Sequence, residues 1–148
     1  MVLLMGGELI LASSSEVRKE LLEKSNISFL SVKPNIDEDA VKTSLLNENY
    51  SPRDIADALA ELKASKISLK NPDSLVLGCD QILEFEGLIL KKPSSKNIAV
   101  QQLMKISGKK HTTYSAAVIF ENAQPIWRFV GKADLFLKNN SERYIYDY

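Results

Sequence analysis

Apolar residues in the first half of the chain alternate between short continuous runs and helical stripes. Residues 8–12 and 27–32 are mostly apolar segments of strand length, and Pro34 ends the second segment. Between them, residues 15–24 carry apolar side chains at helical spacing, and the serines at residues 13–15 can cap a helix. This order predicts a strand, a helix and a second strand.

The longest helical pattern follows an acidic loop at residues 35–40. Ser51 supplies a capping side chain and Pro52 stands at the first helical position, which is typical of a helix start. From Ile55 onward, isoleucine, leucine and alanine recur on one face, and the turn residues 71–73 end the pattern. The small alanines predict that this helix packs closely on a sheet.

Strands dominate the second half of the chain. A buried strand is expected to end just before the polar pair Asp80 and Gln81, and a glycine-containing turn after it indicates a hairpin. Ser141 can cap a last, short helix. The expected elements are strands at 75–79, 82–85 and 88–90, a helix at 97–106, and strands at 112–120 and 126–137.

This order of elements predicts an α/β fold with a mixed sheet and helices outside it. Strands and helices alternate first and strands follow, which favours layers of helix on sheet. The chain has 148 residues and shows no internal repeat or linker, so residues 1–148 are expected to form a single domain.

Composition excludes several classes of partner. Lysine plus arginine and aspartate plus glutamate number 19 each, so no global charge recruits nucleic acid polymers or membranes. The first residues lack a basic segment, and Gly6, Gly7 and Glu8 interrupt their apolar run, which argues against a signal peptide or a membrane span. The single cysteine, Cys79, cannot form an internal disulfide. We expect a cytoplasmic protein.

The serine-rich turn before the first helix is a candidate anion site. Free backbone N–H groups at a helix N-terminus, together with small serines, suit an anion. Arg18 and Lys19 lie in the first helical turn, where cations are unfavourable unless an anion neutralises them. The alternative is an ordinary serine cap with solvated charges.

Acidic residues occur at two places that the fold could bring together. Asp37, Glu38 and Asp39 lie in the predicted loop after Pro34, and Asp80 follows a predicted strand. Ligand sites in open α/β sheets form at the carboxyl ends of strands, and carboxylates converging there could hold Mg²⁺. The alternative for the loop acids is a solvated surface.

Two lysines could supply positive charge to such a site. Lys63 lies close to the apolar side of the long helix, and Lys92 precedes Pro93; either could instead be a surface lysine. His111, the only histidine, cannot form a zinc site alone, and a structural hydrogen bond is expected for it. The sequence contains no P-loop, nucleophile elbow or H-E-x-x-H motif.

Taken together, these segments resemble the Maf family of nucleoside triphosphate pyrophosphatases, also called septum-formation proteins. The order and spacing of the matching segments hold from Glu8 to about Tyr144. Six motifs in register make the resemblance specific. They are LILASSSEVRKELLEKSNISF, the PNIDE loop, ELKA, LVLGCDQ, LILKKP and ISGKKHTTYSAAVIF.

The resemblance implies an elongated α/β fold with a deep nucleotide-binding cleft. It also implies cleavage of a nucleoside triphosphate between its α- and β-phosphates, dependent on Mg²⁺ or Mn²⁺, to a monophosphate and pyrophosphate. Matching positions are Ser13, Ser15 and Arg18 in the phosphate-binding turn, Lys63 and Lys92 as phosphate-neutralising lysines, Glu38 and Asp80 as metal ligands, and Asp80 as general base.

Three further features concern substrate and extent. Gln81 after the catalytic acid resembles the branch associated with 7-methyl-GTP, in which this amide helps to read the base. The family's S-P-R-R is Ser15-Glu16-Val17-Arg18 here, and Lys91 replaces a glycine. The chain stops at ERYIYDY where relatives continue, so it is expected to be truncated relative to the family.

The expected truncation predicts an uncovered surface in the C-terminal third, and hence self-association or a homodimer. The apolar residues expected to lack cover are Phe129, Leu135, Phe136, Tyr144 and Tyr146. The sequence thus leaves three hypotheses: an active metal-dependent pyrophosphatase, a weakly active nucleotide-binding remnant of the same fold, and an interaction protein of cell division.

Overall fold

The computed structural model describes residues 8–148. The sequence analysis argued against a signal peptide or a membrane span at the start of the chain. That prediction concerns residues 1–7, which lie outside the described residues. Among the described helices, none has the length and apolarity that a membrane crossing requires. The elements are β1 (Ile10–Leu11), α1 (Glu16–Lys24), β2 (Leu30–Ser31), α2 (Glu38–Asn47), α3 (Pro52–Ser68), β3 (Leu75–Phe85), β4 (Leu88–Leu90), α4 (Lys96–Ile106), β5 (Lys110–Glu121), β6 (Gln124–Phe136) and α5 (Glu142–Asp147).

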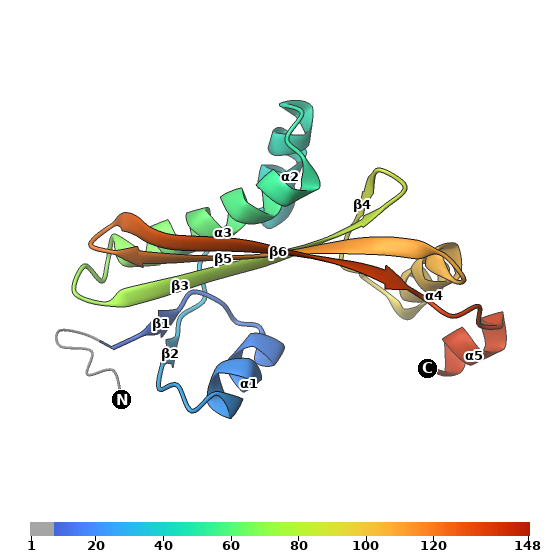
Figure 1. Cartoon of the computed structure of the whole chain (residues 1–148), viewed down its shortest axis with the longest axis horizontal. Helices are drawn as coiled ribbons and strands as arrows, with labels where there is room; N and C mark the ends of the chain where they lie inside the picture. The colour runs from blue at the N-terminus through green and yellow to red at the C-terminus, as the bar shows by residue number, and fades with distance from the viewer. Residues whose placement is uncertain (1–7) are drawn as a thin grey trace.

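The strands form one mixed sheet in the order β2-β1-β3-β5-β6, with β4 paired to the end of β3. β1 runs parallel to β2 and β3, whereas the β3–β4, β3–β5 and β5–β6 pairs are antiparallel. The long strands β3, β5 and β6 extend along the molecule, and β4, α4 and α5 gather at one end (Figure 1). The predicted mixed α/β fold and its elongated sheet are confirmed.

The core lies between α3 and one face of the sheet. Burial alternates along β3 and β5, so that Val76 and Val118 are fully buried while their chain neighbours are more exposed. Alternation of this kind is expected for a sheet that is covered on one face. The apolar stripe of α3 supplies the other half of the core, with Ile55, Ala56, Leu59, Ala60, Ala64 and Ile67.

Helix α3 and strand β3 approach each other unusually closely at Gly78. A Cβ atom at Gly78 would lie 2.8 Å from the Cβ of Ala64 and would overlap the backbone oxygen of Ala60. Glycine on the strand and alanine on the helix therefore permit a separation that larger side chains would prevent. This separation brings Lys63 of α3 within reach of Asp80 of β3.

The prediction that Asp37, Glu38 and Asp39 lie in a loop is wrong, because these residues begin α2. Asp37 is the N-cap, and its carboxylate accepts a hydrogen bond from the Ala40 amide at 3.1 Å. Acidic side chains in the first turn favour a helix, since they face its positive end. The apolar signal on α2 is short: Val41 and Leu45 are only partly buried against the core.

The prediction that a strand ends before Asp80 is also wrong. β3 continues through Asp80 and Gln81 to Phe85, because β5 pairs with it without a break from Leu75 to Glu84. The two polar residues occupy opposite faces: Asp80 is buried and Gln81 is exposed. A polar pair does not interrupt a strand when its partner strand satisfies the backbone.

The predicted hairpin of residues 82–90 is confirmed, the expected strands at 112–120 and 126–137 form a second one, and the turns of both explain the chain reversals. Asn122 and Ala123 between β5 and β6 both have positive φ, as do Glu86 and Gly87 between β3 and β4. Two consecutive residues of this conformation match the twist of antiparallel strands. The predicted hydrogen bond of His111 is not seen at its Nδ1 atom, which is buried without a partner.

We predict that Gly78→Ala destabilises the fold by about 1–3 kcal/mol or more, because the added methyl group must displace the α3 backbone. Gly131→Ala is the matched control: its new Cβ would meet the Phe129 ring at 3.4 Å and no closer atom. Urea denaturation of both variants measures the effect. Equal stabilities of the two variants would contradict the close approach of α3 and β3.

Candidate active site

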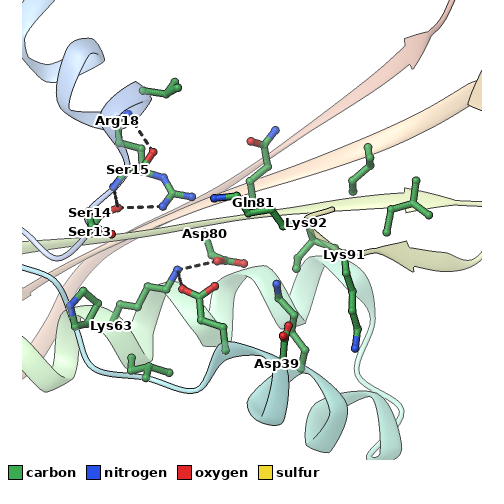
Figure 2. A pocket seen from close by; sticks show the side chains of 18 of the residues that line it. Ser13, Ser14, Ser15, Arg18, Asp39, Lys63, Asp80, Gln81, Lys91 and Lys92 are labelled. Atoms are coloured by element: carbon green, nitrogen blue, oxygen red, sulfur yellow. Dashed lines mark hydrogen bonds and ion pairs between the residues drawn. The ribbon is translucent and has the colours of Figure 1, made fainter. Parts of the chain in front are cut away.

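A cleft of about 1390 Å³ opens where the edge of β3 is unpaired. β1 pairs with Val76 and Leu77, and β4 pairs with Leu83 to Phe85, so the segment between them has β5 alone as a neighbour. Helices α1 and α2 lie on either side of this gap (Figure 2). All eight predicted site residues line the cleft, namely Ser13, Ser15, Arg18, Glu38, Lys63, Asp80, Gln81 and Lys92.

A buried lysine joins the two carboxylates at the floor of the cleft. The Lys63 Nζ atom lies 2.9 Å from Asp80 Oδ1 and 2.7 Å from Glu38 Oε1. It also donates a hydrogen bond to the Cys79 carbonyl at 3.3 Å, so its three N–H donors are all engaged. The side chains of Lys63 and Asp80 are only 4% and 5% exposed, which rules out the surface alternative for Lys63.

The pKa values of the two carboxylates shift in opposite directions because their surroundings differ. Burial raises the pKa of Asp80 above the usual value, and the nearby Lys63 offsets this effect only in part. Burial also opposes ionisation of Glu38, but its hydrogen bond and charge interaction with Lys63 outweigh burial and lower its pKa. Asp80 is therefore the stronger base of the pair, and Glu38 the more firmly ionised acid.

One oxygen of Asp80 has no hydrogen-bond partner among residues 8–148. Its Oδ2 atom is buried and accepts no hydrogen bond in the structure. A buried carboxylate oxygen without a donor is costly, unless a ligand, a water or a cation completes it. The geometry thus leaves one acceptor of Asp80 free for chemistry while Oδ1 is held by Lys63.

The acidic residues offer only part of a metal shell. Within residues 8–148, no group of three or more histidine, cysteine or acidic side chains is arranged to hold a metal ion. Glu38 and Asp80 lie side by side because both contact the same lysine nitrogen. Two carboxylates suit Mg²⁺ or Mn²⁺, provided that water and substrate phosphates complete the shell.

The serine turn before α1 is built around the Ser13 hydroxyl. Ser13 Oγ accepts hydrogen bonds from the Ser15 amide at 3.1 Å and from the Arg18 guanidinium at 3.2 Å. Ser15 caps the helix by accepting from the Arg18 amide. Arg18 is thereby directed across the cleft, as Figure 2 shows, so the arrangement is more than an ordinary serine cap.

The substitutions in this turn replace one arginine of the family pattern by Val17 and add an acid at Glu16, but they keep Arg18. Glu16, which replaces a proline of the family pattern, forms an ion pair with Lys19 at 2.9 Å. The side chain of Glu16 is 78% exposed, so its charge is largely solvated. Arg18 is the cation that contacts the Ser13 hydroxyl, and Glu16 does not pair with it.

Lysines and an amide line the opposite side of the cleft. Lys91 and Lys92 are exposed in the loop after β4, and Gln102 of α4 donates a hydrogen bond to the Lys91 carbonyl at 2.8 Å. Gln81 is exposed on β3 and lines the same cleft. The loop that carries Lys92 is thus anchored to α4, and the Lys92 residue itself is exposed.

Sequence reasoning missed several residues that line the cleft. Lys42 stands one helical turn after Glu38, and its charge helps to lower the pKa of Glu38. Recognising α2 as a helix would have placed Lys42 beside Glu38, since residues four apart share a helical face. Three apolar residues from distant segments also line the cleft, namely Leu83, Leu90 and Ile98. No pattern in the sequence indicated that they would meet there.

Comparison with known proteins identifies the family of this chain. The family described as "Maf-like protein" matches residues 8–148, which is nearly the whole chain. The chain belongs to the Maf-like protein family. The cleft residues identified above therefore lie in the region that this Maf-like chain shares with its family.

Curated relatives of this Maf-like chain carry two names. A protein of Ruegeria pomeroyi named "Nucleoside triphosphate pyrophosphatase" is 51% identical over 140 residues, covering 95% of this chain and 70% of the relative. A protein of Brucella abortus named "7-methyl-GTP pyrophosphatase" is 40% identical over 132 residues, covering 89% of this chain and 66% of the relative.

A solved structure confirms the fold. The Staphylococcus aureus Ham1 protein superposes with a TM-score of 0.51 at 14% sequence identity, covering 86% of this Maf-like chain and 70% of that protein. At this identity the likeness concerns the fold alone.

We predict that Lys63→Met destabilises the protein by about 3–5 kcal/mol near neutral pH, because it leaves the buried Asp80 carboxylate without its cation. The loss should be smaller in acid. A carboxyl whose pKa is raised on folding binds more protons in the folded than in the unfolded state, so stability falls as pH rises from the ordinary aspartate pKa through the folded pKa.

Urea denaturation at several pH values tests this dependence. The double variant Lys63→Met/Asp80→Asn should recover part of the stability and lose the pH dependence that Asp80 causes. Lys70→Met, at an exposed lysine just after α3, is the control and should match the unmodified protein. A Lys63→Met protein that is as stable as the Lys70→Met control would contradict a buried ion network.

Proposed function

We propose that the protein hydrolyses a nucleoside triphosphate between its α- and β-phosphates, releasing a nucleoside monophosphate and pyrophosphate. The observation that carries this proposal is Asp80. Its carboxylate lies at the cleft floor with one oxygen held by Lys63 and the other without a partner. Burial raises its pKa, which makes it a better base than an ordinary aspartate. The names of the curated relatives support the same reaction class.

Phosphate binding would rest on charges from three segments. Arg18 and the N-terminus of α1 stand on one side of the cleft, and Lys92 stands in the loop on the other. Positive charge and free N–H groups suit the anionic triphosphate. These groups would also stabilise the negative charge that develops on the leaving pyrophosphate. Lys42 would add to this field from α2.

In the proposed reaction, a water oxygen attacks the α-phosphorus, and the bond from that phosphorus to the bridging oxygen breaks. The proton of the water passes to Asp80 Oδ2, and pyrophosphate carries away the bonding electrons. Lys63 holds Asp80 Oδ1 and Glu38 in place, so the base needs little reorganisation. Lys63 can contact a phosphate only if one of its present hydrogen-bond acceptors moves away. Of the two carboxylates, Glu38 is the more exposed and is therefore the better placed to move.

Glu38 and Asp80 are the residues that would hold Mg²⁺ or Mn²⁺. When bound, the ion would neutralise phosphate charge and favour ionisation of the attacking water. The firmly ionised Glu38 and the adjacent Asp80, two hard oxygen ligands at the cleft floor, are the features that fit such an ion.

For the base of the substrate we propose a guanine-type nucleotide, with 7-methyl-GTP as the first candidate. Gln81 follows Asp80 on the exposed face of β3 and presents an amide that can both donate and accept hydrogen bonds. Leu83, Leu90 and Ile98 form an apolar wall on which a base could lie. The name of the Brucella abortus relative supports this candidate. We also propose a cytoplasmic location, where nucleoside triphosphates are available.

Asp80→Asn is predicted to lower the turnover number by about 10²- to 10⁴-fold, because an amide of nearly the same shape cannot accept the proton. Pyrophosphate release from a nucleotide panel that includes 7-methyl-GTP measures the loss. Asp73→Asn, at an exposed acid in the turn before β3, is the control and should retain full activity. Turnover of Asp80→Asn near that of the control would remove Asp80 from the role of base.

Chelation is predicted to silence turnover, and added Mg²⁺ or Mn²⁺ to restore it. Glu38→Gln should raise the metal concentration that gives half-maximal activity, because it removes one of the two carboxylate ligands. Glu48→Gln, at the exposed C-terminal end of the same helix, is the control. Undiminished pyrophosphate release in excess EDTA would exclude the metal requirement.

A further inference from the structure

Two apolar side chains and a hydroxyl form a row across the sheet, a few residues beyond Asp80 along β3. Leu83 pairs with Leu90 of β4 on one side and with Thr113 of β5 on the other. Directly paired residues lie on the same face of a sheet, so the three side chains are neighbours. All three line the cleft, and together they offer a surface on which a flat ring can lie.

Helix α4 contributes two further side chains to the same part of the cleft. Ile98 and Gln102 both line it, and residues four apart share a helical face. The Nε2 atom of Gln102 donates a hydrogen bond to the Lys91 carbonyl at 2.8 Å. Because Lys91 directly follows the last residue of β4, this contact places the half-buried Gln102 amide beside the row of Leu83 and Leu90.

The Lys91 carbonyl decides which end of the Gln102 amide is free. A carbonyl oxygen only accepts hydrogen bonds, so it must meet the nitrogen end of the amide. A half-turn of the amide would set Oε1 against the carbonyl oxygen, with acceptor facing acceptor, and would lose the bond. The oxygen of Gln102 is therefore held as the end available to a ligand.

Gln81 differs from Gln102 in this respect. It is exposed, and Figure 2 shows its amide without a hydrogen bond to the other residues drawn. An amide without a fixed partner can turn either its oxygen or its nitrogen toward a ligand. Gln81 can consequently pair with an acceptor or a donor of a base, whereas Gln102 offers a fixed acceptor.

A fixed acceptor distinguishes the two purine bases. Guanine carries two adjacent donors, N1–H and the N2 amino group, on one edge, whereas adenine has the acceptor N1 and a C–H group at the same places. An amide oxygen facing this edge pairs with guanine and leaves an unmatched acceptor pair with adenine. Sites that are built to bind a particular N–H group reject analogues that lack it.

We propose that Gln102 is a specificity-determining residue, whose Oε1 atom accepts a hydrogen bond from N1–H or the N2 amino group of a guanine-type base lying on Leu83 and Leu90. This inference rests on the proposed function and names the residue that separates guanine from adenine. N7 of guanine lies on the other edge of the base, with O6. Gln102 therefore reads guanine with or without a methyl group at N7.

The ratio of kcat/KM for GTP to kcat/KM for ATP, measured by pyrophosphate release, tests this role. Gln102→Leu should lower the ratio by roughly five- to tenfold, because one hydrogen bond specific to guanine is lost. Gln101→Leu is the matched control on the same helix. Gln101 is exposed and is not among the residues that line the cleft, so its replacement should leave the ratio unchanged.

Gln102→Glu separates base reading from anchoring of the Lys91 loop. Glutamate keeps an oxygen acceptor but cannot donate to the Lys91 carbonyl. If Gln102 reads the base, Gln102→Glu should keep the ratio of GTP to ATP at or above that of the unmodified protein. If Gln102 only anchors the loop, the glutamate and leucine variants should lose activity with both nucleotides alike. Equal ratios in these two variants would overturn the proposal.

Binding of the α,β-methylene analogues of GTP and ATP, measured by calorimetry with Mg²⁺ present, separates this inference from the proposed reaction. Neither analogue can be cleaved at the α–β position. A preference for the guanine analogue that Gln102→Leu abolishes supports base reading, and it does so even if GTP releases no pyrophosphate, which would overturn the reaction alone. Turnover of GTP with an unchanged ratio in Gln102→Leu would overturn the role of Gln102 alone. Failure of both analogues to bind would overturn both.

Discussion

The site depends on the close approach of helix α3 to strand β3 at Gly78. No side chain separates the two backbones there, and Ala60 and Ala64 form the facing surface of the helix. Because the helix lies so near the strand, Lys63 can reach Asp80 and the Cys79 carbonyl from within the core. A larger residue at position 78 would move the lysine away from the acid. The small residues thus set the geometry of the charged ones.

The two acids of this ion network are buried to different degrees, and their pKa values shift in opposite directions. Asp80 is enclosed on β3, where desolvation dominates and raises its pKa. Glu38 lies on the first turn of α2 at the cleft side, where the charges of Lys63, Lys42 and Arg18 prevail over burial and lower its pKa. Two carboxylates on one lysine therefore differ in basicity, and such a difference commonly distinguishes an acid–base group from a charge-holding group.

Local patterns predicted most elements, and misjudged those that depend on tertiary contacts. The helix at Pro52–Ser68 carries its own cap and a long apolar stripe, so periodicity was sufficient. Helix α2 has a cap at Asp37 but no fully buried residue, so its apolar signal was too weak. The length of β3 is decided by its partner: β5 pairs past Asp80, which a single strand cannot reveal.

In the candidate site too, local patterns predicted which residues matter, whereas the contacts between them depend on tertiary structure. Residue patterns singled out most of the eight candidate site residues, the family resemblance assigned their expected roles, and the structure places all eight in one cleft. The contact between Lys63 and both acids, however, joins α2, α3 and β3, and no spacing in the sequence encodes that distance. Lys42 was missed for a simpler reason, because its helix was taken for a loop.

The cleft combines rigidly held and lightly held groups, and this division follows from where each lies. Asp80 and Lys63 belong to the packed interface of β3 and α3, whereas α1 and α2, which carry Arg18 and Glu38, have no fully buried residues. Segments with few buried contacts open at a lower free-energy cost than core elements. Arg18 and Glu38 therefore lie on the more easily displaced elements of the cleft, whereas Asp80 and Lys63 are fixed to its core. An enzyme that must orient one reacting oxygen precisely needs only the core groups to be rigid.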